Sequence, residues 1–358
     1  MIHWRRGRVL QVIRERRGFQ EIAVATAEGG GRAVVLTDLT GPVRPGDEVI
    51  LNVTAVRLGL GTGGRHFVAA IEGRLPPDPV APGHLMKLRY TPFQLRCRTV
   101  EEEEGETPPG LDGGVVVVGE LHSQLLPAAV ALRMSLGPKA RLVYVMTDGG
   151  ALPLPISDLA AAMRERGFLD GTVTAGHAFG GDLEALNIYS GLLAARHVLA
   201  ADVTLVMMGP GIAGSGSRFG HTGVEQAVNA DAVGILGGRA VLVPRLGFRD
   251  TRPRHYGLSH HSLTVFGRLT QRRALLPIPV LSGAELDYVF RQIAAEGLHE
   301  RHDLLLIEAG EVLAWLRGYG IEARTMGRGP DEEPAFFLAA GAAGLAAARL
   351  YLETRKRE

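Results

Sequence analysis

Short apolar runs separated by glycine and proline turns fill residues 1–75 and predict a small β-domain. Each run is rich in β-branched residues or alternates apolar with polar positions, as a strand that buries one face does. The runs are Gly7–Ile13, Ile22–Ala27, Ala33–Thr37, Glu48–Val56 and His66–Ile71. Five short strands at this spacing are typical of a small barrel.

A proline-rich stretch follows the predicted barrel and indicates a linker. The sequence LPPDPVAPG contains four prolines, which remove backbone donors and disfavour regular structure. We therefore divide the chain into a barrel-like domain at 1–75, a linker at 76–83 and a larger domain at 84–358.

The pattern changes beyond residue 114, where apolar runs alternate with segments of helical periodicity. The expected strands are Val115–Gly119, Arg141–Thr147, Thr172–Gly176, Val203–Gly209, Ala240–Pro244 and Asp303–Glu308. The expected helices span 121–136, 156–166, 182–200, 222–237, 284–299 and about 334–355. Runs such as VVVVG and VTLVMMG are apolar on every side, as parallel strands covered on both faces are. The larger domain is thus expected to be a doubly wound, mostly parallel, three-layer α/β ligand-binding domain.

The amino-acid composition limits which cellular compartment and which partners are expected for this protein. One cysteine, Cys97, excludes an intramolecular disulfide and any Cys-x-x-Cys metal cluster. The N-terminus lacks the pattern of a signal peptide, and the longest apolar run, Ala335–Ala348, is shorter than the roughly 18–20 residues that span a bilayer. We expect a cytoplasmic protein without a membrane span, in which the last helix packs on the sheet or, as a second role, forms a homodimer contact.

The charge distribution gives little support for a nucleic-acid partner. The net charge is +1, although the first 17 residues hold six arginines against Glu15. Only Trp4, Phe19 and Phe67 offer stacking faces in the barrel. A nucleic-acid-associated role of the barrel is therefore the least favoured of the functions considered.

The strongest local signal is the glycine- and serine-rich segment GPGIAGSGSRFGHTG at 209–223. It follows an apolar strand and precedes a helix, and its glycines allow positive φ and leave backbone N–H groups uncovered. We expect it to bind a phosphate or carboxylate; the alternative is a conformationally demanding loop that binds nothing. The predicted ligand-binding residues of this segment are Gly209, Gly211, Gly214, Ser215, Gly216, Ser217, Arg218, His221 and Thr222.

Three familiar motifs do not fit this segment. Gly209, Gly211 and Gly214 satisfy G-x-G-x-x-G, but the helix does not open at the third glycine and the next strand ends in Pro244–Arg245 rather than an acid. A P-loop would need a lysine after Gly214, where the chain has serine. No G-x-S-x-G elbow occurs, so an α/β-hydrolase is not supported either.

Other polar residues follow the predicted strands and are expected at the same sheet edge. Proton transfer is assigned to His122, His177 and His261 with Asp148, since imidazole titrates near neutral pH. Arg245 and Arg249 are predicted to hold a second charged group of the ligand. Asp182 is included as a ligand-binding residue; the alternative is that it complements the dipole of the helix it precedes.

No metal or cofactor is assigned. Several of these residues are of types that ligate divalent ions, but no recognised ligand spacing connects them. A functional role is also expected for the cluster Ser259–His260–His261 and the nearby Tyr256, because adjacent histidines bring no packing advantage to a loop.

Four segments together resemble a bacterial family catalogued as a domain of unknown function. They are TDLTGPVRPGDEVILNVTAVRLGLGTGG, AFGGDLEALNIYSGL, GPGIAGSGSRFGHTG and GLSHHSLT, and the resemblance runs from Met1 to about Leu350. It implies no activity, cofactor or catalytic residue, so the functional expectation depends on residue chemistry. We expect an enzyme acting on a small anionic, phosphorylated or nucleotide-like metabolite; the alternative is a non-catalytic metabolite-binding or regulatory protein.

Overall fold

The computed structural model describes residues 1–76, 78 and 83–356 and divides the chain into two compact units. They are Met1–Arg98 and Thr99–Glu358, and each is described by itself. Residues 77 and 79–82 of the predicted linker lie outside the described residues. The first unit includes 84–98, which the sequence pattern assigned to the larger domain.

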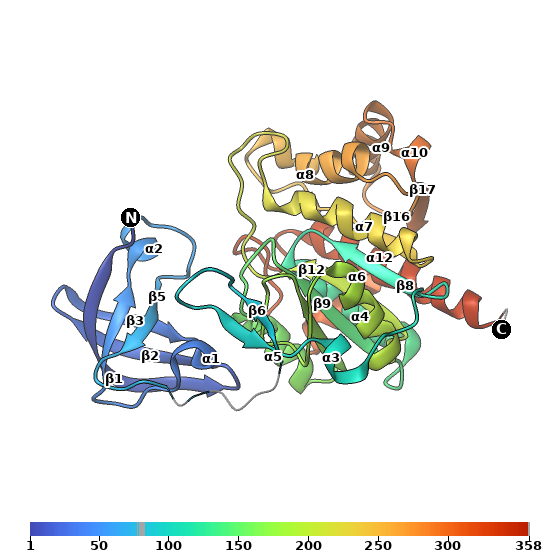
Figure 1. Ribbon diagram of the computed structural model, residues 1–358. Helices are drawn as coiled ribbons and strands as arrows, with labels where there is room; N and C mark the ends of the chain where they lie inside the picture. The colour runs from blue at the N-terminus through green and yellow to red at the C-terminus, as the bar shows by residue number, and fades with distance from the viewer. Residues whose placement is uncertain (77, 79–82, 357–358) are drawn as a thin grey trace. The chain divides into compact units, whose positions relative to one another are not determined.

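The first unit contains the expected barrel (Figure 1). Its five strands close in the order β1-β2-β3-β5-β4, and the apolar side chains of Val9, Ile22, Val24 and Leu51 fill the interior. The strands are β1 Trp4–Arg16, β2 Phe19–Thr26, β3 Gly29–Val35, β4 Glu48–Asn52 and β5 Arg65–Ile71. Two short helices, α1 (Thr37–Thr40) and α2 (Thr54–Arg57), and a small hairpin of β6 (Leu85–Lys87) and β7 (Leu95–Cys97) complete the unit.

The second unit contains a parallel sheet of eight strands flanked by helices, as a doubly wound α/β domain does. The order is β11-β10-β9-β12-β8-β13-β16-β17, and neighbouring strands pair in parallel. Their bounds are β8 Val115–Gly119, β9 Leu142–Thr147, β10 Gly171–Ala175, β11 Leu183–Ala185, β12 Val203–Met208, β13 Arg239–Val243, β16 Leu275–Pro279 and β17 Asp303–Ile307. The predicted fold class is confirmed. Since the strands are parallel, the loops that follow them start at one edge of the sheet.

The helices cover both faces of this sheet, because alternate residues of each buried strand pack on opposite core layers. Val115 and Val117 of β8 contact one layer, and Val116 and Val118 contact the other. The helices are α3 Val100–Glu104, α4 Leu125–Leu136, α5 Asp158–Glu165, α6 Ile188–Leu193, α7 Glu225–Ile235, α8 His260–Thr264, α9 Gly283–Ala295, α10 Leu298–Arg301, α11 Gly310–Gly318 and α12 Pro334–Arg355. Short 3₁₀ turns precede three of them: η1 (His122–Gln124), η2 (Leu154–Ile156) and η4 (Thr222–Val224). A further turn, η5 (Pro253–His255), precedes a short strand.

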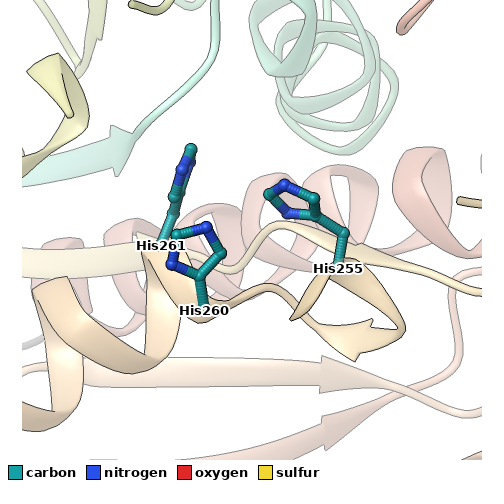
Figure 2. Close-up of side chains that lie close together, drawn as sticks. All are labelled: His255, His260 and His261. Carbon is teal, nitrogen blue, oxygen red and sulfur yellow. The ribbon is translucent and has the colours of Figure 1, made fainter. Parts of the chain in front are cut away.

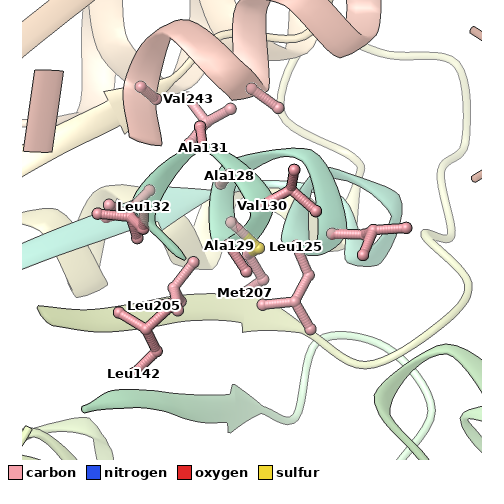
Figure 3. Close-up of a cluster of buried hydrophobic side chains, with 14 of the residues drawn as sticks. Leu125, Ala128, Ala129, Val130, Ala131, Leu132, Leu142, Leu205, Met207 and Val243 are labelled. Atoms are coloured by element: carbon pink, nitrogen blue, oxygen red, sulfur yellow. The ribbon is translucent and has the colours of Figure 1, made fainter. Parts of the chain in front are cut away.

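Helix α4 is buried along most of its length. Figure 3 shows its side chains against Leu142 of β9, Leu205 and Met207 of β12 and Val243 of β13. Helix α12 packs beside α4, where a Cβ on Gly344 would overlap the carbonyl of Ala128. By length and composition α12 is apolar enough to cross a membrane, but 72% of its apolar window is buried inside the protein. It is a core helix of a globular unit, with the sheet-packing role that the sequence predicts.

Two elements differ from the sequence-based expectation. The helix predicted over 182–200 is wrong for its first residues: they form the edge strand β11, and α6 begins at Ile188 after the side chain of Asn187 caps the N–H of Ser190 at 3.1 Å. Strand β16 was not predicted, because Pro277 and Pro279 remove ladder donors and are uncommon inside strands. The structure also places Asp182 at the start of β11, facing Thr172 at the start of β10.

Candidate functional site

The loops after β8, β12 and β13 bring polar side chains to the carboxyl edge of the sheet. Glu120 directly follows β8, and Arg245 follows β13 by two residues. The glycine- and serine-rich segment follows β12, which lies next to β8 in the sheet. A further segment, 253–264, includes η5, the short strand β15 (Gly257–Leu258) and α8, and it returns to the same place.

The segment after β12 forms a hairpin that closes on itself. Ser215 N–H donates to Gly220 at 2.7 Å, Thr222 N–H donates to Ala213 at 2.9 Å, and Gly214 bridges to His221. The hydroxyls of Ser215 and Ser217 lie 3.0 Å apart and bond within the turn. The helix begins at Glu225, one 3₁₀ turn after the hairpin, and not at Gly214. Part of the predicted polar surface of the loop is thus used to hold the hairpin.

Glycines let the loops after β9 and β12 touch. A Cβ on Gly209 would overlap the carbonyl oxygen of Ala151, and one on Gly150 would overlap the carbonyl of Gly209. Ala151 N–H also donates to Pro210 at 2.9 Å. This contact fixes the base of the hairpin against the neighbouring loop.

Four histidines gather where the hairpin ends and α8 begins. The rings of His221 and His261 stack with centroids 3.9 Å apart and planes inclined by 10°. His260 lies 4.3 Å from His261 and 4.9 Å from His255, measured between ring centroids. Figure 2 shows the rings of His255, His260 and His261 close together. We call these four residues the histidine cluster.

A buried carboxylate and a buried guanidinium lie against the histidine cluster. Glu120 is fully buried, accepts a hydrogen bond from the hydroxyl of Ser262 at 2.7 Å, and lies 3.8 Å from Nδ1 of His261. The guanidinium of Arg245 reaches the same nitrogen at 3.4 Å and lies 3.8 Å from Asp250. Asp250 in turn accepts two bonds from the Arg252 side chain, at 2.9 and 2.7 Å.

Burial controls the protonation of this group. It raises the pKa of Glu120 from 4.5 to about 7, an effect that the Ser262 hydrogen bond and the charge of Arg245 oppose. Burial also lowers the pKa of His255 to about 3, of His260 to about 4 and of His261 to about 2, and nearby arginine charges add to these shifts. The three imidazoles are therefore neutral at pH 7, and each ring keeps one nitrogen lone pair, which on His261 faces Arg245.

Four buried polar atoms of the histidine cluster and Glu120 have no hydrogen-bond partner among the described residues. They are Oε2 of Glu120, Nε2 of His260 and both ring nitrogens of His221. An unsatisfied buried polar atom costs about 1–3 kcal/mol, so native structures contain few of them without a functional reason. Their convergence beside Arg245 makes this place the candidate site of the unit.

The family comparison agrees with the resemblance found in the sequence. Residues 32–344 match the model of a family described as "Protein of unknown function (DUF3866)". This chain belongs to the DUF3866 family. No curated protein and no solved structure matches it. The functional argument for this DUF3866 protein therefore depends on the geometry of its own residues.

A second polar group in the DUF3866 protein lies where β9 ends and α7 begins. The hydroxyl of Thr147 bonds the carboxyl of Glu225, and Gln226 donates to the same carboxyl at 3.1 Å. Burial raises the pKa of Glu225 from 4.5 to about 7, and the nearby charge of Asp148 adds to the rise. Gly149 lies directly against this carboxyl, where a Cβ would contact it.

Two of the histidines predicted for proton transfer occupy other positions. His122 has both ring nitrogens engaged, Nδ1 with the Tyr144 hydroxyl at 3.1 Å and Nε2 with the Ser157 hydroxyl at 2.7 Å. Burial lowers its pKa to about 4. The backbone N–H of His177 donates to Asp148 at 2.8 Å, so Asp148 joins the loops after β9 and β10. His122 is thus held as a structural residue, whereas His261 lies in the histidine cluster.

The remaining predicted ligand-binding residues are divided between the site and other places. Arg245, His221 and Thr222 lie at the site, and Arg218 lies on the exposed hairpin tip. Asp182 bonds Thr172 at 2.9 Å and the side chain of Arg164, so the structure does not bring it to the carboxyl edge. The side chain of Arg249 is exposed, and its backbone N–H donates to Glu333 at 3.1 Å.

Sequence reasoning did not select Glu120, Glu225 or His255. A usable signal existed for Glu120, because a carboxylate directly after an all-apolar strand is expected at the carboxyl end of the sheet. Glu225 resembles an ordinary carboxylate in the first turn of a helix, where it complements the helix dipole. His255 is five residues from His260, and only the turn through Gly257 brings their rings together.

Proposed function

We propose that this protein is a cytoplasmic enzyme that binds a small anionic metabolite at the histidine cluster. The observation that carries the proposal is the convergence of buried, incompletely bonded polar groups from separate loops, with Glu120 and His260 beside Arg245. Parallel α/β sheets bind ligands at this edge, in the crevice outside the carboxyl ends of the strands. The single buried cysteine, Cys97, agrees with a reducing compartment.

The charge around the cluster favours an anion. Arg245, Arg252 and Arg254 act on its histidines, and each lowers the pKa of at least one of them. The carboxylates that oppose these cations are Asp250, which Arg252 already binds, and Glu120, whose raised pKa leaves it partly protonated at pH 7. A phosphate or carboxylate group would supply the missing negative charge and could bond a guanidinium in a bidentate manner.

Arg254 also connects the hairpin to this charge. Its Nη1 donates to the carbonyl of Gly216 at 3.2 Å, so the glycine- and serine-rich loop is held beside the arginines. Gly211 and Gly216 have positive φ, which opens the backbone of the loop toward a ligand. This placement supports the anion-binding role that the composition of the loop predicts.

Glu225 is the residue that we assign to proton transfer. It lies at the same sheet edge, four residues after His221, and it is partly buried against Gly149. A carboxyl whose pKa lies near 7 can both accept and donate a proton at cellular pH. The Thr147 hydroxyl fixes the orientation of its carboxyl.

The first test of the proposal is a thermal-shift screen with inorganic phosphate, pyrophosphate, nucleotides, sugar phosphates and dicarboxylates. A ligand at about 100 times its dissociation constant adds about 2.7 kcal/mol of apparent stability. We expect Arg254→Gln to reduce the shift. Arg273→Gln should not, because Arg273 is exposed and pairs with Asp303 at the amino end of β16. Equal shifts in both variants would refute anion binding at this site.

The second test separates an enzyme from a regulatory binding protein. With a ligand from the screen, Glu225→Gln should abolish turnover and leave the dissociation constant within a few-fold of wild type. Binding without turnover in the wild-type protein, across ligands of every class in the screen, would instead favour the regulatory alternative.

The barrel gives weaker support to a nucleic-acid role. Arg5 pairs with Glu28, Arg6 with Glu72 at 2.8 Å, and Arg8 approaches Glu48 at 3.8 Å. These acidic partners on neighbouring segments reduce the local positive charge that phosphate binding needs.

A further inference from the structure

The histidine cluster contains a group of ring nitrogens with the spacing of metal ligands. In the described part of the chain, one ring nitrogen from each of His255, His260 and His261 lies within 4.8 Å of the others. In a tetrahedral zinc site with Zn–N bonds of about 2.0–2.1 Å, ligand nitrogens are about 3.3 Å apart. Small side-chain rotations would therefore bring the three nitrogens onto one ion. We infer that His255, His260 and His261 bind a divalent transition-metal ion, with Zn²⁺ as the ion that suits three imidazoles.

The local backbone explains why three histidines meet here. Ser259 is the N-cap of α8, and its hydroxyl accepts the N–H of His261 at 3.2 Å. The same hydroxyl lies 2.8 Å from Nδ1 of His255, so one serine fixes both the helix start and the His255 ring. His260 and His261 occupy the first two positions of α8, and the turn at Gly257, with φ of +72°, returns the chain from His255.

The outer nitrogens of two rings have the partners that metal-binding histidines usually have. A metal-bound imidazole donates its second N–H to a hydroxyl, carbonyl or carboxylate, which fixes the ring and its tautomer. Ser259 can accept from Nδ1 of His255. Nδ1 of His261 lies 3.4 Å from the guanidinium of Arg245 and 3.8 Å from the free Oε2 of Glu120, and binding of an ion through Nε2 would change this Nδ1 from an acceptor of the arginine to a donor to Glu120. In these tautomers Nε2 of His255 and of His261 is left for the ion, as is the unbonded Nε2 of His260.

The contrast with His122 argues against a purely structural role. His122 is a buried histidine whose two nitrogens both have hydrogen-bond partners. His260 is partly buried, yet its Nε2 is enclosed and has no partner among the described residues. Coordination of an ion by Nε2 of His260 would explain this difference, because a metal ligand needs a lone pair that accepts no hydrogen bond.

Nearby positive charges lower the affinity of this site for a cation, but nearby carboxylates compensate for part of their effect. Arg245 and Arg252 oppose a cation, whereas Glu120 and Asp250 attract it. An ion bound by three neutral imidazoles keeps its full positive charge and an open coordination position. Ion binding itself does not require the proposed catalysis.

The test is a Zn²⁺ titration of the chelator-treated, full-length, tag-free protein by calorimetry and by competition with a chromogenic chelator. We expect one ion per chain, with affinity reduced at least about 100-fold by His255→Asn, His260→Asn or His261→Asn. Glu120→Gln should cost about 10- to 100-fold, as the loss of an outer-sphere partner does. His299→Asn is the matched control, because His299 is exposed on α10.

A second measurement avoids variants that fail to fold. X-ray absorption at the zinc edge of the wild-type protein should show at least three imidazole ligands. A site with fewer imidazoles, binding that His261→Asn leaves unchanged, or no stoichiometric binding would overturn the inference. If Zn²⁺ binds as expected but no anion does, the metal site stands and the proposed function fails.

Discussion

Replacing Glu225 with glutamine should change how the stability of the α/β unit depends on pH. Burial raises the pKa of Glu225 from 4.5 to about 7, so the folded unit binds this proton more tightly than the unfolded chain does. The stability that this proton contributes is fully present below pH 4.5 and is lost as the pH rises through 7. A rise of about 2.5 in pKa corresponds to about 3 kcal/mol.

Glutamine mimics the protonated carboxyl at every pH and therefore removes this dependence. The free energy of unfolding of Glu225→Gln, relative to wild type, should rise by up to about 3 kcal/mol between pH 4.5 and pH 8. The value is an upper bound because the side chain of Glu225 is partly exposed. Only the change with pH is diagnostic, since a constant offset reflects the altered bonds to Thr147 and Gln226.

The assay is urea unfolding followed by tryptophan fluorescence at several pH values. The chain has two tryptophans, Trp4 in the barrel and Trp315 on α11, so a Trp4→Phe background reports the α/β unit alone. Glu311→Gln, at an exposed carboxyl of α11, is the control and should behave as wild type at every pH. A stability difference between Glu225→Gln and its parent that stays constant from pH 4.5 to 8 would refute the reasoning.

Three further predictions concern packing and hydrogen bonding, and each is measured by chemical unfolding in the same background. Gly209→Ala should destabilise the unit by about 1–3 kcal/mol or more, because its Cβ overlaps a neighbouring carbonyl, whereas Gly283→Ala has open space and should cost little. Equal costs would contradict the close approach. Tyr144→Phe should cost about 1–3 kcal/mol by leaving His122 and the carbonyl of Met208 without the hydroxyl, and it should not change anion affinity. Leu205→Ala, at a fully buried position of β12, should cost about 2–5 kcal/mol, and a cost below 1 kcal/mol would mean that the core repacks there.

The fold was predictable because its strongest signals are local. Runs such as VVVVG are apolar at every position, and such a run fits a strand that is covered on both faces. The same logic failed where the local signal is weak. The strand of β11 has three residues, and the prolines of β16 conceal a strand that parallel pairing with β17 stabilises.

The candidate site was predictable only in part, because its geometry depends on contacts between distant segments. The rule that loops after parallel strands share an edge correctly placed Arg245 and His261 together. This rule could not predict that Tyr144 and Ser157 would occupy both ring nitrogens of His122, since neither partner is near His122 in the sequence. Hydrogen-bond saturation, which separates a structural histidine from a functional one, is a property of the folded chain.

The short turn η4 connects the two polar groups of the site and gives the hairpin a definite part in the proposed function. His221 ends the hairpin and stacks on His261, and Glu225 begins α7 and bonds Thr147. Only the residues of η4 separate them, so the hairpin leads directly into α7. The base of the hairpin is fixed by the close approach at Gly209, whereas its tip is exposed and held by the bond from Arg254 to Gly216. An anion that binds Arg254 would contact the exposed tip of the same hairpin that leads into Glu225, so we predict that the proposed proton transfer depends on occupancy of the proposed anion site.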